Sequence, residues 1–111
     1  MSSEAVDAAL RALSHPVRRD LIRLCGRGER TVGELAELAG LRQPATSQHL
    51  RVLREAGLVQ IEARGNRRLY HVDFQRLAAV QTALGDLWQT HLPRLKAAAE
   101  ELTAEDSRTD D

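Results

Sequence analysis

The sequence has little cysteine and few aromatic residues. Its 111 residues include one Cys, one Phe, one Trp and one Tyr. An aromatic-lined pocket for a small molecule is hard to build from so few rings, and the single cysteine, Cys25, cannot form an internal disulfide. No apolar run approaches the roughly 20 residues that span a bilayer. These shortages predict a soluble protein of a reducing compartment, the cytoplasm, with no membrane contact.

The residues that are abundant are typical of a small helical protein. Hydrophobic residues, chiefly Leu and Ala, make up 42% of the chain, and charged residues make up 29%. The formal net charge is zero, but six acidic residues and one Arg occupy the last twelve positions, whereas six arginines and two glutamates lie between Arg42 and Val72. We therefore expect a local basic surface on one domain, residues 1–102, followed by an acidic flexible tail, residues 103–111.

Capping residues and helical periodicity predict four helices in the first half of the chain, over residues 3–13, 16–25, 31–39 and 43–56. Thr31 and Glu34 have the spacing of a capping box at the start of the third helix. Gly40 has the position of a left-handed helix stop.

In the second half of the chain, the spacing of the apolar residues changes from a helical period to that of strands. Two β-rich runs flank Gly65-Asn66 and predict a hairpin that ends at Val72. A long helical pattern then runs from Phe74 to about Leu102, and Pro93 should kink it near residues 89–91. The expected fold class is mainly α with a small β-hairpin, a winged helix-turn-helix of about five helices.

The short helix at 31–39, the Gly-Leu turn and the helix at 43–56 have the order of a helix-turn-helix, whose second helix enters the major groove by its N-terminal end. Small hydrogen-bonding side chains there suit base edges, and arginines one turn later suit phosphates. An ordinary solvated helix end is the alternative. The predicted DNA-binding residues of this helix are Arg42, Gln43, Pro44, Thr46, Ser47, Gln48 and Arg51, with Arg54 as a further phosphate contact.

The hairpin strengthens that prediction because its tip is basic. A protruding loop that carries arginine suits the negative potential of a narrow minor groove. A basic hairpin alone indicates little, since charged runs are usually only solvated, but its position directly after a helix-turn-helix is that of a wing. The predicted DNA-binding residues of the hairpin are Arg64, Asn66, Arg67 and Arg68.

Several stretches together resemble the ArsR family of bacterial repressors: Leu13 to Arg19, Leu35-Ala36, Leu41, Gln43 to Val59 and Arg64 to Tyr70. The resemblance is close over residues 5–73 and loose over the last helix. It implies a homodimeric repressor that binds an inverted-repeat operator in double-stranded DNA, with the helix from Gln43 in the major groove. Arg42 departs from the pattern, because the family often has Ser at this helix cap, and we expect a phosphate contact in place of the cap.

The last helix carries a seam of apolar residues at alternating spacings of four and three, which favours a partner helix. Packing against its own domain is the alternative. The predicted dimer interface combines this seam with the first helix and consists of Leu10, Leu13, Leu84, Leu87, Trp88, His91, Leu92 and Leu95.

The sequence offers no ligand set for a metal. Metal sensors that resemble this chain use cysteines in the third helix, which here has none, or Asp and His in the last helix, where Asp86 and His91 lie five apart on poorly matched faces. Cys25 is expected to be a buried apolar residue. We predict no metal, no cofactor and no enzymatic activity. An unidentified small-molecule effector, a thiol- or metal-responsive repressor and a winged-helix protein-interaction module remain alternatives.

Overall fold

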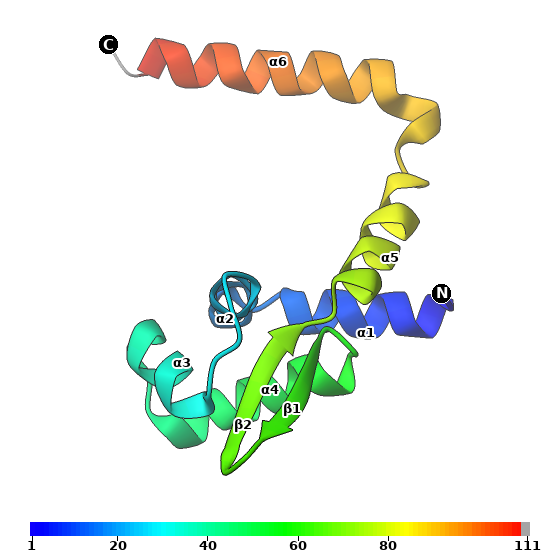
Figure 1. The fold of residues 1–111 in the computed structure, drawn as a ribbon. Coiled ribbons are helices and arrows are strands. Elements are labelled where there is room, and N and C mark those ends of the chain that lie inside the picture. Colours follow the sequence, from blue (N-terminus) through cyan, green and yellow to red (C-terminus); the bar gives the residue numbers. More distant parts are fainter. Residues whose placement is uncertain (110–111) are drawn as a thin grey trace. The chain divides into compact units, whose positions relative to one another are not determined.

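The computed structural model describes the backbone of residues 1–109 and the side chains of residues 1–106 (Figure 1). Over these residues the chain forms six α-helices, one 3-10 helix and one antiparallel pair of strands. Their order is α1 (Ser3–Leu13), α2 (Pro16–Gly26), α3 (Val32–Ala39), α4 (Gln43–Glu55), β1 (Val59–Arg64), β2 (Arg67–Val72), α5 (Phe74–Gly85), η1 (Gln89–His91) and α6 (Leu92–Thr109). The prediction of a mainly α fold with a small hairpin is confirmed.

The chain divides into two compact units, Met1–Val80 and Gln81–Asp111, which we describe separately. The core of the first unit is formed by α1, α2, α3, α4 and the hairpin. Its largest fully buried side chains are Leu21, Leu35, Thr46, Leu50, Leu53, Leu58 and Val59. Because Leu50 and Leu53 lie on one side of α4, burial of that side leaves the opposite side of the helix in solvent.

The turn between α3 and α4 depends on the predicted caps. Thr31 Oγ1 accepts a hydrogen bond from the Glu34 amide at 3.2 Å, and Glu34 Oε1 accepts one from the Thr31 amide at 3.0 Å. Gly40 ends α3 with a φ of 69°, a left-handed conformation that a side chain would strain. Arg42 precedes α4 and makes no side-chain cap, in agreement with its departure from the usual Ser.

The hairpin β1–β2 pairs Val59 with Val72 at its base and Arg64 with Arg67 at its tip. Gly65 supplies the positive φ, 59°, that the tip requires. On the other side of β2, the loop before α3 adds an isolated bridge: the Arg30 amide donates to the Tyr70 carbonyl at 3.2 Å and the Tyr70 amide donates back at 2.7 Å. β2 therefore has backbone partners on both sides at Tyr70.

The last helical pattern is divided rather than kinked, so the described residues contain six α-helices where about five were expected. α5 ends at Gly85, and the 3-10 helix η1 at Gln89–His91 precedes α6. Gly has low helix propensity, and Pro93 is compatible only with the first turn of the helix that follows. The break falls at the residues where Pro93 predicted a kink.

α6 continues through residues 103–109, which were expected to form a flexible tail. This stretch contains neither Gly nor Pro, so nothing in it ends the helix. The rest of the expected tail, residues 110–111, lies outside the described residues. Among the helices of the described chain, none combines the length and the apolar character that crossing a membrane requires.

Candidate nucleic-acid interface

The N-terminal end of α4 presents a polar surface to solvent. Arg42, Gln43, Pro44, Ser47 and Gln48 are all exposed, because the buried side of the helix faces the core. Arg51 and Arg54 extend this surface toward the C-terminal end of α4 and are exposed as well. All of these residues except Pro44 carry side chains that can donate hydrogen bonds to base edges or pair with backbone phosphates.

Thr46 is the exception among the predicted contacts of α4, and for its side chain the prediction is wrong. Its side chain is fully buried, and its hydroxyl donates to the Arg42 carbonyl at 2.9 Å. Thr46 lies four residues before Leu50 and so shares its side of the helix. The residue therefore stabilises the first turn of α4 from inside, where no duplex can reach it.

A cavity of about 210 Å³ lies between α4 and β2. Its lining residues are Ser47, Leu50, Arg51, Arg54, Arg68 and Tyr70. Over the side chains that the structure describes, none of these three arginines has a carboxylate partner. The structure thus brings three predicted residues of the helix, Ser47, Arg51 and Arg54, and one predicted residue of the hairpin together around a single positively charged space.

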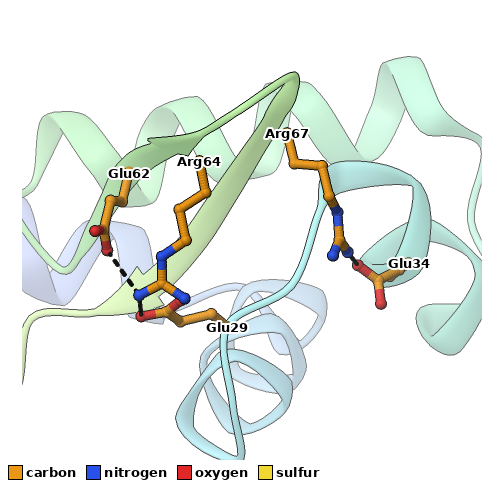
Figure 2. A network of polar contacts seen from close by, with 5 residues as sticks. All are labelled: Glu29, Glu34, Glu62, Arg64 and Arg67. Carbon is orange, nitrogen blue, oxygen red and sulfur yellow. Dashed lines mark hydrogen bonds and ion pairs between the residues drawn. The ribbon is translucent and has the colours of Figure 1, made fainter.

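The other two arginines of the hairpin are already paired (Figure 2). Arg64 Nη1 lies 3.0 Å from Glu29 Oε2, and Arg64 Nη2 lies 3.4 Å from Glu62 Oε2. Arg67 Nη2 lies 2.9 Å from Glu34 Oε1. Local sequence patterns do not indicate Glu29 and Glu34 as partners, because 35 and 33 positions separate them from Arg64 and Arg67.

Glu34 connects the hairpin to the start of α3. The pKa of its carboxyl is lowered, first by the hydrogen bond from the Thr31 amide, then by that from the Thr31 hydroxyl, with a smaller contribution from Arg67. The group is therefore anionic at neutral pH. One carboxylate both caps α3 and holds Arg67, so a phosphate that approaches Arg67 must compete with it.

Arg18 connects α4 to the end of α1. Its Nε donates to His49 Nδ1 at 3.3 Å, and its Nη1 donates to the Arg11 and Ala12 carbonyls at 3.3 and 3.4 Å. The ring of His15 packs against that of His49 with 4.8 Å between centroids. Burial lowers the pKa of His49, and His15 and Arg18 lower it further. His49 is thus a neutral, packed residue that fixes α4.

Cys25 is buried in α2, with 3% of its surface exposed. Burial raises the pKa of its thiol to about 11, although the charge of Arg30 acts in the opposite direction. This is the environment of an unreactive, structural cysteine. In the part of the chain that the structure describes, no group of three or more His, Cys, Asp or Glu residues could hold a metal ion.

The predicted dimer-interface residues come from both units. In the first unit, Leu10 is exposed and Leu13 is half-buried. In the second unit, Leu84 is half-buried, whereas Leu87, Trp88, His91, Leu92 and Leu95 are exposed. Within the second unit, exposure of so many large apolar side chains is unusual for a monomer.

Residues 13–62 match the sequence model of a helix-turn-helix domain. The chain is 42% identical over 82 residues to the HTH-type transcriptional regulator Rv2034 of Mycobacterium tuberculosis, covering 74% of this chain and 77% of that protein. It is 38% identical over 81 residues to the biofilm growth-associated repressor of Xylella fastidiosa, covering 73% and 71% of the two chains.

Solved structures agree with these relatives. A possible transcriptional regulator for arsenical resistance is 41% identical, with a TM-score of 0.69 over 81% of this chain and 94% of that one. The homodimeric winged helix-turn-helix DNA-binding domain Mb0332 of Mycobacterium bovis, a possible ArsR-family transcriptional regulator, is 29% identical, with a TM-score of 0.63 over 75% of this chain and 80% of that one. The predicted winged helix-turn-helix fold is therefore confirmed.

Proposed function

The chain belongs to the ArsR family of DNA-binding transcriptional regulators, and from that premise we propose that it represses transcription as a homodimer on an inverted-repeat operator. The observation that carries the proposal is the exposed polar end of α4, with the arginines of α4 and β2 around one cavity beside it. Two copies present two such surfaces, which suit half-sites one turn of the duplex apart.

In this arrangement α4 reads bases in the major groove. Gln43 and Gln48 project from its first two turns, where the recognition helix of a helix-turn-helix meets base edges, and Ser47 lines the cavity beside them. Arg42 and Arg51 bind backbone phosphates on either side. The hairpin lies over the adjacent minor groove with Asn66 and Arg67 at its tip, and Arg68 faces the cavity beside α4.

The apolar residues of the second unit supply the dimer contact. Leu87 and Leu92 are 69% and 51% exposed, and the part of the unit that the structure describes has no buried core residue of its own. Burial of this surface, with Leu10 of α1, against a second copy would stabilise the pair. The homodimeric relative from Mycobacterium bovis supports the same assembly.

The regulator works in the cytoplasm, where its DNA is, and acts by binding rather than by catalysis. It needs neither a metal nor a cofactor. A buried Cys25 and the lack of a ligand set among the described residues both argue against a thiol or metal effector. A small molecule, a partner or its own abundance sets its occupancy of the operator.

The test is binding to the DNA immediately upstream of the chain's own gene, measured by fluorescence anisotropy. The variant Arg67→Ala/Arg68→Ala should weaken binding to all duplexes and flatten the dependence on salt. Arg23→Ala is the control, because Arg23 is equally cationic but pairs with Asp20 on α2, outside this surface. A protein that stays strictly monomeric, or ignores duplex DNA in dilute buffer, would contradict the proposal.

A further inference from the structure

The cavity between α4 and β2 has the chemistry of an anion site. Resting on the proposed DNA-binding function, we propose that it holds one backbone phosphate of the duplex, shared by Arg51 and Arg54 of α4 and Arg68 of β2. The helix and the hairpin then bind the same phosphate, rather than each binding its own.

The residues around the cavity fit a phosphate and exclude a cation. The lining consists of three arginines, two residues with hydroxyl groups, Ser47 and Tyr70, and the buried apolar residue Leu50, and it contains no carboxylate. Arg and phosphate form paired, charge-assisted hydrogen bonds, and serine and tyrosine hydroxyls donate to the same oxygens.

Arg68 differs from the other arginines of the hairpin in its partners. Glu29 and Glu62 neutralise Arg64, and Glu34 neutralises Arg67 (Figure 2). Adjacent residues of a strand point to opposite faces, so Arg68 lies on the face of β2 away from Glu34. It reaches the cavity with its charge uncompensated within the described part of the chain, and its ligand must come from outside.

The geometry of the duplex identifies that ligand. A helix in the major groove and a hairpin over the neighbouring minor groove lie on either side of one sugar–phosphate strand, because that strand separates the two grooves. A space between α4 and β2 that is lined by cations therefore faces the backbone itself. The shared chemistry is a phosphate group, and the backbone of DNA is its source.

A double-mutant cycle tests whether two arginines share one phosphate. Arg51→Gln and Arg68→Gln should be non-additive: if each weakens DNA binding about ten-fold per half-site, the pair should weaken it by well under 100-fold. The double variant should also reduce the slope of log affinity against log salt by about 0.9 per half-site, the value for one phosphate.

The matched control is the pair Arg42→Gln with Arg68→Gln. Arg42 precedes α4 and lies about 14 Å from Arg51 along the helix, at a rise of 1.5 Å per residue, so it meets a different phosphate. This pair should be additive and should reduce the slope by about 1.8 per half-site. If Arg51 and Arg68 behave like the control pair, the shared site is refuted. If the wild-type chain does not bind DNA at all, the proposed function fails instead.

Inorganic phosphate distinguishes the two possible sources of the ligand. It is titrated into the protein–DNA complex against sodium chloride at constant ionic strength. If phosphate releases more DNA than chloride does, and this excess disappears in Arg68→Gln, then free phosphate also enters the cavity. No excess release, with the coupling of Arg51 and Arg68 retained, would mean that the site accepts phosphate only as part of the duplex. The proposal would be overturned if the effects of Arg51→Gln and Arg68→Gln on DNA affinity are additive and phosphate still releases excess DNA from Arg68→Gln.

Discussion

Thr46 and Ser47 are adjacent in α4, and their variants should have opposite consequences. Thr46→Ala removes a hydroxyl that donates to the Arg42 carbonyl and a methyl group, both fully buried. The hydrogen bond contributes about 1 kcal/mol and the methyl about 0.8 kcal/mol. The free energy of unfolding should therefore fall by about 2 kcal/mol, and Tm by roughly 10 °C.

Thr46→Val separates the two contributions. It keeps the shape of the side chain, and the Arg42 carbonyl still accepts the Thr46 amide hydrogen bond at 3.0 Å, so no acceptor is left unpaired. The cost should stay below about 1 kcal/mol. Neither Thr46 variant should change DNA affinity by more than about two-fold, because the Thr46 side chain is buried and does not contact DNA.

Ser47→Ala should leave the stability nearly unchanged and weaken DNA binding. Ser47 is exposed and lines the cavity, so its stability should change by less than about 0.5 kcal/mol, whereas loss of a hydrogen bond to a charged phosphate should weaken DNA binding about ten-fold. Thermal unfolding gives the first quantity, and anisotropy at a temperature where every variant is folded gives the second. If Thr46→Ala is folded and loses as much DNA affinity as Ser47→Ala, the orientation of α4 derived above is refuted.

Three further predictions follow from charges and burial. Glu34→Gln keeps an oxygen for the Thr31 amide but frees Arg67, so DNA affinity should rise about two- to five-fold at low salt and converge with wild type at high salt; unchanged low-salt affinity would contradict competition for Arg67. Iodoacetamide should label Cys25 far more slowly in the native protein than in urea, measured by mass spectrometry, because the thiol is buried and its pKa is raised to about 11; equal rates would exclude burial. Hydrogen bonds lower the pKa of Asp73, and the largest effect comes from the Arg76 amide. The ionised Asp73 therefore stabilises the folded protein fully above the ordinary pKa of 3.8. This contribution is lost as the pH falls through the lowered folded-state pKa. Asp73→Asn should therefore lose less Tm than wild type between pH 6 and pH 3, a range that includes the ordinary value of 3.8 below which the loss begins.

Most of the helix-turn-helix was predictable because its signals are local. The Thr31–Glu34 capping box, the Gly40 stop and the Gly65-Asn66 tip each depend on residues within a few positions of one another, and each lies where it was predicted. The buried orientation of Thr46 was also available, from its spacing to Leu50 and Leu53, but residue type alone suggested a DNA contact.

The parts that the sequence did not reveal depend on tertiary structure. The partners of Arg64 and Arg67 are brought close only when the hairpin packs beside the loop before α3. The cavity around Arg68 likewise needs α4 and β2 side by side. Gly85, which ends α5, is a weak signal, since an isolated glycine within a helical pattern is often tolerated.

The bridge between Arg30 and Tyr70 also bears on self-association. An open strand edge is a template on which another chain can add a strand, and this hairpin has two edges. At Tyr70 the edge of β2 is paired with Arg30 of the same chain, so another chain cannot add a strand at that position. β1 carries Glu62 and Arg64 near its tip, and such charges discourage strand addition. The Arg30 bridge on β2 and the charges on β1 thus both reduce the tendency of this small sheet to add a strand from another chain.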